Sequence, residues 1–71
     1  MRELTMEEIK KLAARPGVKK IAVENFLMTI HHNPSIQAAL ENLALDAKLY
    51  RWNRATVKAI LTGIKLSGTR K

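Results

Sequence analysis

The chain is 71 residues long, has no cysteine, and carries 13 Lys and Arg against 6 Asp and Glu, a formal net charge of +7. This length allows one domain around a single small core. The lack of cysteine excludes a disulfide framework and thiolate metal sites. No apolar run approaches the roughly 20 residues that cross a bilayer, and no signal peptide precedes the first predicted helix. We therefore expect no membrane partner and an intracellular location, in the cytoplasm, nucleoid or nucleus.

The first predicted helix covers residues 5–15. Thr5 is a suitable N-cap, and Glu8 follows at the spacing of a capping box. Apolar residues recur at helical spacing and predict the buried side of this helix: Ile9, Leu12 and Ala13. Pro16 has no backbone N–H, and Pro16-Gly17 is a turn sequence, so the helix should end just before this pair.

The second predicted helix covers residues 18–31. Its core stripe consists of Val23, Phe26, Leu27 and Ile30. The opposite side carries Lys19, Lys20 and Asn25, a combination of cations and an amide that suits contact with phosphates and with adenine.

Residues 9–28 together resemble the helix-turn-helix of bacterial repressors, particularly those related to the lactose repressor. The resemblance is carried by Leu12-Ala13, Gly17-Val18, Val23 and Phe26. In that family the second helix enters the major groove of DNA. The resemblance therefore implies a transcriptional regulator in which Lys19, Lys20 and Asn25 meet the groove. An ordinary helical hairpin would need the same small, glycine and apolar residues, so both interpretations stay open.

Two further helices are predicted, at residues 34–51 and 53–67. Asn33 is the expected N-cap of the third helix, with Pro34 at its first position. Its apolar stripe is Ile36, Leu40, Leu43, Ala47 and Tyr50. Asp46 lies within this stretch, so one helix and two shorter helices both remain open. Asn53 should cap the fourth helix, and Gly63 inside it would permit close packing. We expect a compact all-α, four-helix single domain over residues 1–71, with a helix-turn-helix-like first pair and a frayed basic tail at 67–71.

A second basic region lies around the start of the fourth helix. Residues 31–71 hold seven Lys and Arg against two acids, whereas residues 1–30 hold six against four. Basic residues alternate with aromatic ones here, a pattern that suits phosphate contact and base stacking. The predicted binding residues of this region are Lys48, Arg51, Trp52, Arg54 and Lys58.

The basic composition favours nucleic acid as the partner, with duplex DNA ahead of RNA. Two other interpretations stay open. One is a helical module for an acidic protein partner, with Ile21, Met28, Leu45 and Leu49 as its contact surface, and the other is an RNA or single-strand binder that uses Tyr50 and Trp52. Homodimerisation is also left open. We predict no catalytic residues, no metal site and no cofactor, because the sequence has no glycine-rich phosphate loop, no nucleophile paired with a base, and no further ligand at suitable spacing from His31-His32.

Overall fold

Helix α1 (Met6–Ala13) begins at the predicted cap in the computed structural model of the chain, which describes residues 1–68. The Glu8 backbone N–H donates to the Thr5 hydroxyl at 3.1 Å, and the Glu8 carboxylate accepts from the Thr5 N–H at 2.9 Å. This reciprocal capping box is the one expected from the sequence. The helix ends at Ala13, two residues earlier than predicted, because the chain already departs from helical geometry ahead of Pro16.

Helix α2 (Lys20–Met28) is shorter at both ends than the predicted 18–31. Its first turn is delayed because Lys19 is extended and serves as the N-cap. After Met28 the chain tightens into a single 3₁₀ turn, η1 (Ile30–His32). The predicted helix is therefore confirmed over residues 20–28, but both of its predicted ends are wrong.

Helix α3 (Ile36–Tyr50) is one continuous helix, so Asp46 does not divide it. The prediction that Asn33 caps it with Pro34 at the first position is wrong. Ser35 is the N-cap, and its hydroxyl accepts from the Ala38 N–H at 3.2 Å. Asn33 is occupied elsewhere, because its side-chain amide donates to the Ile30 carbonyl at 3.1 Å and closes η1.

Helix α4 (Arg54–Gly68) is capped as predicted, since the Asn53 side-chain oxygen accepts from the Thr56 N–H at 3.0 Å. At its other end it joins the N-terminal segment. The Ser67 hydroxyl donates to the Arg2 carbonyl, and the Arg2 N–H donates to the Ser67 carbonyl at 3.1 Å. Ser67 and Gly68 thus continue α4, while the rest of the predicted tail, residues 69–71, lies outside the described residues.

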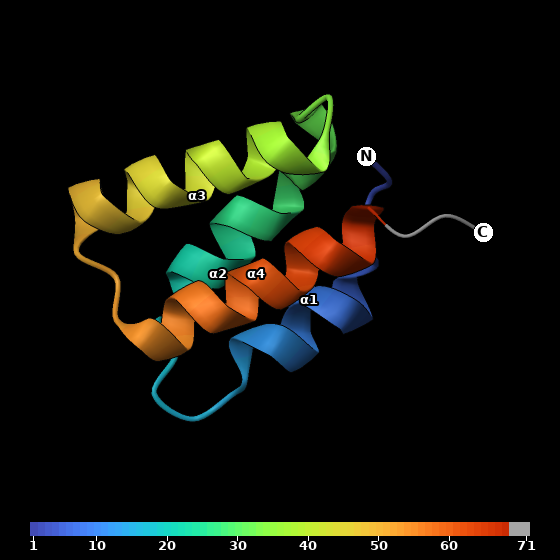
Figure 1. Cartoon of the computed structure of the whole chain (residues 1–71). Helices are drawn as coiled ribbons and strands as arrows, with labels where there is room; N and C mark the ends of the chain where they lie inside the picture. The colour runs from blue at the N-terminus through green and yellow to red at the C-terminus, as the bar shows by residue number, and fades with distance from the viewer. Residues whose placement is uncertain (69–71) are drawn as a thin grey trace.

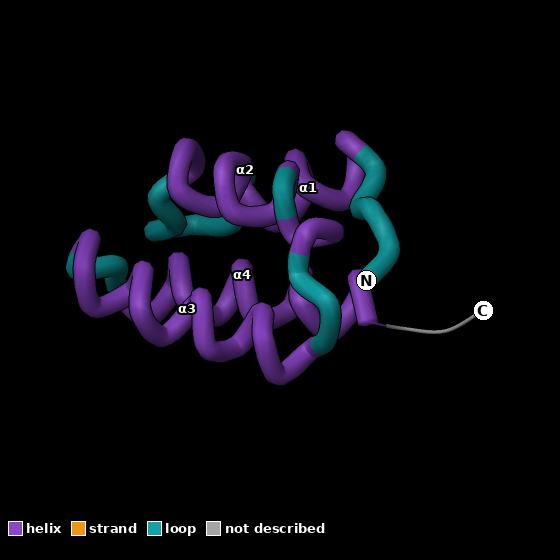
Figure 2. The backbone as a smooth tube through the Cα atoms, turned by 90° about the horizontal axis from the view of Figure 1, so that it is seen from above, coloured by secondary structure: helices purple, strands orange, loops and turns teal. Residues whose placement is uncertain are grey.

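These helices form an all-α, four-helix fold, as predicted, and residues 1–68 contain no strand. Figure 2 shows α1 and α2 in one layer and α3 and α4 in the other. Helix α4 is central and packs against α1, α2 and α3. The core side chains come from all four helices, η1 and the N-terminal segment: Leu4, Ile9, Leu12, Ala13, Val23, Leu27, Ile30, Ala39, Leu43, Ala59, Ile60 and Ile64.

The buried side of α3 differs from the predicted stripe. Ala39 and Leu43 are buried, but Ile36 and Leu40 are about 40 % exposed and Tyr50 is 58 % exposed. Helix α3 packs mainly against α4, and its contacts with α2 are much sparser. The side of α3 that faces α2 is therefore left partly open.

Candidate nucleic-acid interface

The connection between α1 and α2, residues 14–19, folds onto the start of α4. Gly17 has a φ of +77°, the left-handed conformation expected for it, and Ala13 beside the turn is buried. The Asn53 side-chain amide donates to the Gly17 carbonyl at 2.7 Å. The Lys19 N–H donates to the Thr56 hydroxyl at 2.8 Å. Two hydrogen bonds thus fix the first predicted basic region to the second.

The connection between α3 and α4 is only three residues long, Arg51–Asn53. It reverses the chain through Arg51, which has a left-handed φ of 55°, while the Trp52 N–H donates to the Ala47 carbonyl at 3.0 Å. A left-handed conformation costs an L residue other than glycine roughly 1–2 kcal/mol, so the packing of Trp52 against the core must compensate. The result is that the Arg51 side chain is exposed at the end of the molecule.

Figure 1 shows both connections at one end of the molecule, with the chain termini at the other end. We define the basic end as the exposed cations on these connections and on the adjoining turns of α2, α3 and α4: Arg15, Lys19, Lys20, Lys48, Arg51, Arg54 and Lys58. Within residues 1–68 none of these seven side chains forms an ion pair. The acids closest along the chain are Glu24 on α2 and Asp46 on α3, so the basic end has a clear excess of positive charge.

Two acidic residues, Glu3 and Glu8, lie beside basic side chains at the opposite end of the molecule. Glu8 lies 2.9 Å from the Arg2 guanidinium. The hydrogen bond from Arg2, followed by the one from the Thr5 N–H, lowers the pKa of Glu8 to about 2, and the same pairing raises the pKa of Arg2. His31 Nε2 lies 3.9 Å from the Glu3 carboxylate. These acids therefore do not neutralise the basic end.

The structure divides the predicted binding residues between two neighbouring features. Six of them belong to the basic end, whereas Asn25 and Trp52 line a groove between α2 and α3. Arg15 was not predicted, although it also belongs to the basic end. The sequence signal that could have identified Arg15 is its position directly before Pro16-Gly17, because a residue next to a surface turn is exposed.

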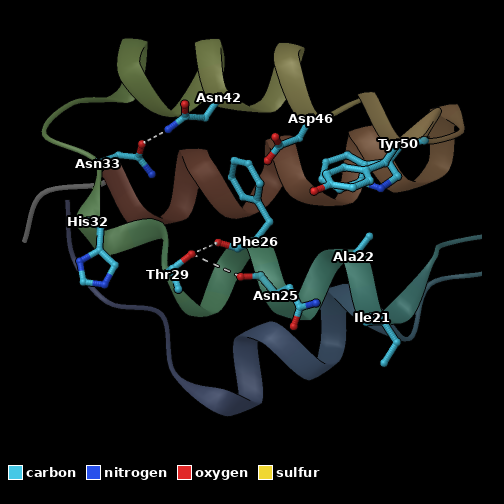
Figure 3. A pocket seen from close by; sticks show the side chains of 11 residues that line it. Ile21, Ala22, Asn25, Phe26, Thr29, His32, Asn33, Asn42, Asp46 and Tyr50 are labelled. Atoms are coloured by element: carbon cyan, nitrogen blue, oxygen red, sulfur yellow. Dashed lines mark hydrogen bonds between the residues drawn. The ribbon is translucent and has the colours of Figure 1, made fainter. Parts of the chain in front are cut away.

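The groove has a volume of about 630 Å³. Figure 3 shows Ile21, Ala22 and Asn25 on the α2 side, Asn42, Asp46 and Tyr50 on the α3 side, and Phe26 between them. We call it the α2/α3 groove, and its lining residues are Ile21, Ala22, Asn25, Phe26, Thr29, His32, Asn33, Asn42, Asp46, Tyr50 and Trp52. Its volume lies in the range of small-molecule sites, and its lining mixes aromatic rings with amide and carboxylate groups.

Two aromatic rings, those of Tyr50 and Phe26, contact the Trp52 ring in this groove. The Tyr50 and Trp52 rings are stacked at a centroid distance of 5.8 Å with an interplanar angle of 20°. Phe26 meets Trp52 edge-on at 6.3 Å and 79°. Tyr50 was predicted to lie on the apolar stripe of α3, but it is instead an exposed ring supported from behind by Trp52.

The polar groups of the groove are only partly paired. The Asn42 amide donates to the Asn33 side-chain oxygen at 2.5 Å. The Asn25 side chain and the Asp46 carboxylate have no hydrogen-bond partner within residues 1–68. Their hydrogen-bonding capacity is therefore free for a ligand.

Comparison of the chain with models of protein families, with curated proteins and with solved structures found no match. The segment 1–68 contains no helix with the length and hydropathy needed to span a membrane.

Proposed function

We propose that the chain binds nucleic acid, with DNA ahead of RNA, and that the basic end contacts the phosphates. The observation that carries this proposal is the position of the two connections. Two regions separated by about thirty residues of sequence are joined by the Asn53–Gly17 and Lys19–Thr56 hydrogen bonds, and their cations share one end. Cations that are exposed and unpaired release counterions when they meet phosphates. The proposed role is therefore binding rather than catalysis.

Helix ends add to this attraction. The basic end includes the N-terminus of α4, where Arg54 occupies the first helical position. The positive end of the helix dipole and the free N–H groups of a first turn favour anions. In this proposal Lys19, Lys20, Arg51 and Arg54 contact successive phosphates, and Lys48 and Lys58 extend the contact along α3 and α4.

The resemblance of residues 9–28 to repressor helix-turn-helix units stays a hypothesis. Its support is the buried Ala13, the left-handed Gly17 and the inward Val23. Against it, the connection between α1 and α2 is six residues long, whereas a helix-turn-helix turn has three or four. A regulator role therefore rests on the charge of the basic end more than on this motif.

The test is a titration of labelled duplex and single-stranded DNA at several salt concentrations. We expect an affinity that falls steeply with salt. If about five of the six named cations contact phosphates at the same time, the log–log slope on duplex DNA should be about −4 to −5. The absence of binding at low salt, or binding that does not change with salt, would reject the proposal.

A second candidate function is that of a helical module that binds an acidic protein partner. The observation that favours it is the exposure of four large apolar side chains on α2 and α3. Ile21 is 66 % exposed, Met28 50 %, Leu45 68 % and Leu49 70 %. Exposed apolar side chains of this size mark protein contacts when they form a patch. This candidate would replace the first if the DNA titration is negative.

A further inference from the structure

We infer that the α2/α3 groove binds one unpaired guanine base of the nucleic acid whose phosphates the basic end contacts. This inference rests on the proposed function and adds to it a base, a binding mode and a preference for unpaired nucleotides.

The exposed ring of Tyr50 offers a surface on which a base can stack. Tyr50 is 58 % exposed, and its ring is held in place by the stack with Trp52, which Phe26 in turn supports edge-on. A rigid, exposed aromatic ring is the element on which proteins stack unpaired bases. Because the ring is already ordered by its neighbours, a base that stacks on it loses little further side-chain entropy.

The carboxylate of Asp46, which lines the groove, can recognise the edge of the base. Asp46 lies one helical turn before Tyr50 on the same side of α3, and its carboxylate is half-buried and has no partner within residues 1–68. A carboxylate offers two acceptors and no donor. The Watson–Crick edge of guanine presents two adjacent N–H donors, N1–H and N2–H, which fit both oxygens.

The other bases fit this carboxylate less well. On the Watson–Crick edges of adenine and cytosine an amino donor lies beside an acceptor nitrogen, and in thymine and uracil the single N–H lies between two carbonyl oxygens. In each case an acceptor would face the carboxylate. Asn25, on the opposite wall of the groove, has a free amide that can donate to guanine O6 or N7. In a duplex the Watson–Crick edge is already occupied, so the base must be unpaired.

The groove adjoins the basic end, and this determines where the phosphate of the bound nucleotide would lie. The groove reaches the basic end where Ile21 follows Lys20 and where Arg51 lies between Tyr50 and Trp52. A base stacked on Tyr50 would therefore place its own phosphate beside Arg51 or Lys20. The volume of about 630 Å³ accommodates a base together with its sugar.

The test uses thymine oligonucleotides of about nine nucleotides with one central guanine, adenine, cytosine or hypoxanthine, since single-strand sites span roughly 4–16 nucleotides. Affinity is measured by anisotropy, and quenching of Trp52, the one tryptophan of the chain, reports stacking beside Tyr50. We expect the guanine oligonucleotide to bind roughly tenfold more tightly than the all-thymine one. Hypoxanthine, which lacks the N2 amino group, should fall between them.

Two pairs of variants separate the base site from general charge. Asp46→Asn should abolish the guanine preference. Glu41→Gln, which removes the same charge from an exposed position of α3 outside the groove, should keep it. Tyr50→Ala should weaken binding of the guanine oligonucleotide roughly tenfold, whereas Tyr50→Phe keeps the ring and should keep the affinity. Circular dichroism checks that each variant remains helical.

The outcomes distinguish this inference from the proposed function. The guanine site is overturned if the guanine, adenine, cytosine and all-thymine oligonucleotides bind equally well and Asp46→Asn and Tyr50→Ala do not change their affinity. If that binding is salt-dependent, phosphate binding by the basic end still stands. Failure of every oligonucleotide to bind at low salt overturns both.

Discussion

Gly17 is the residue on which the α1–α2 connection depends most directly. Its φ of +77° is a conformation that L side chains rarely adopt. A Cβ at this position would meet Ala55 Cβ at 3.6 Å, an ordinary contact, so the cost of adding a Cβ is backbone strain and not a clash. We expect Gly17→Val to lower the free energy of unfolding by roughly 1–2 kcal/mol.

The control for this prediction is the mirror-image residue. Chemical synthesis of the chain with D-Ala and with L-Ala at position 17 compares identical side chains in opposite configurations. The D form adopts a positive φ without strain, so it should be at least as stable as Gly17, and the L form should be less stable. Equal melting temperatures for the two forms would contradict the assignment of a left-handed turn.

The lowered pKa of Glu8 makes the stability of the fold depend on pH. Its pKa is lowered to about 2 in the folded chain, from an ordinary value of 4.5. A carboxyl whose pKa is lower in the folded chain than in the unfolded chain stabilises the fold at pH values above its unfolded-state pKa. This stabilisation is lost as the pH falls from the unfolded-state pKa through the folded-state pKa. Thermal unfolding should therefore show a stability loss from about pH 4.5 down to about pH 2. Glu8→Gln keeps the capping-box hydrogen bond but cannot titrate, so its stability should change less over that range.

At the scale of the elements, the sequence predicts best what depends on neighbouring residues. The Thr5–Glu8 box and the Asn53 cap are set by residues three apart, and both are present. The cap of α3 was misassigned because Asn33 and Ser35 are both good caps and only tertiary contacts choose between them. Asn33 closes η1 and accepts from Asn42, so Ser35 takes the cap.

The candidate site could be predicted only in pieces. Its cations were identified from charge alone, but the bond between Asn53 and Gly17 joins residues 36 positions apart, and no local pattern predicts it. The groove was not predicted, because an apolar period of 3.6 on α3 does not tell which side of the helix its neighbours leave open. The exposure of Tyr50 follows from that open side.

The packing of α4 against α2 depends on Gly63. A Cβ there would lie 2.5 Å from Leu27 Cδ2 and 2.8 Å from Leu27 Cδ1, and Leu27 is buried. We expect overpacking in Gly63→Ala to cost about 1–3 kcal/mol. The higher helix propensity of alanine offsets only about 1 kcal/mol of this overpacking cost. In a Leu27→Ala background the clash disappears, so the same change should become stabilising. Denaturant unfolding of this double-mutant cycle measures the coupling, and an effect of the same sign in both backgrounds would contradict the close contact.

At the scale of the whole molecule, charge is separated along the fold. Glu8 pairs with Arg2 and Glu3 lies near His31 close to the chain termini, whereas seven exposed cations gather at the other end. The sequence divided these cations into two regions that could have served as rival sites. The fold instead joins them, so we expect them to act as one phosphate-binding surface.

The salt dependence of DNA binding by a small set of charge variants tests this joint surface most directly. Lys19 lies on the α1–α2 connection, whereas Arg54 is the first residue of α4. Their side chains are exposed and form no hydrogen bond or ion pair within residues 1–68, so Lys19→Ala and Arg54→Ala should leave the fold intact. Lys65→Ala removes the same charge from an exposed position in the last turn of α4, at the other end of the molecule (Figure 1). We expect each of the first two changes to reduce the log–log slope on duplex DNA by about 0.9, and the double variant by about 1.8, while Lys65→Ala leaves it unchanged. Equal slopes for all variants, or a loss for Lys65→Ala as large as for the others, would contradict a binding surface at the basic end.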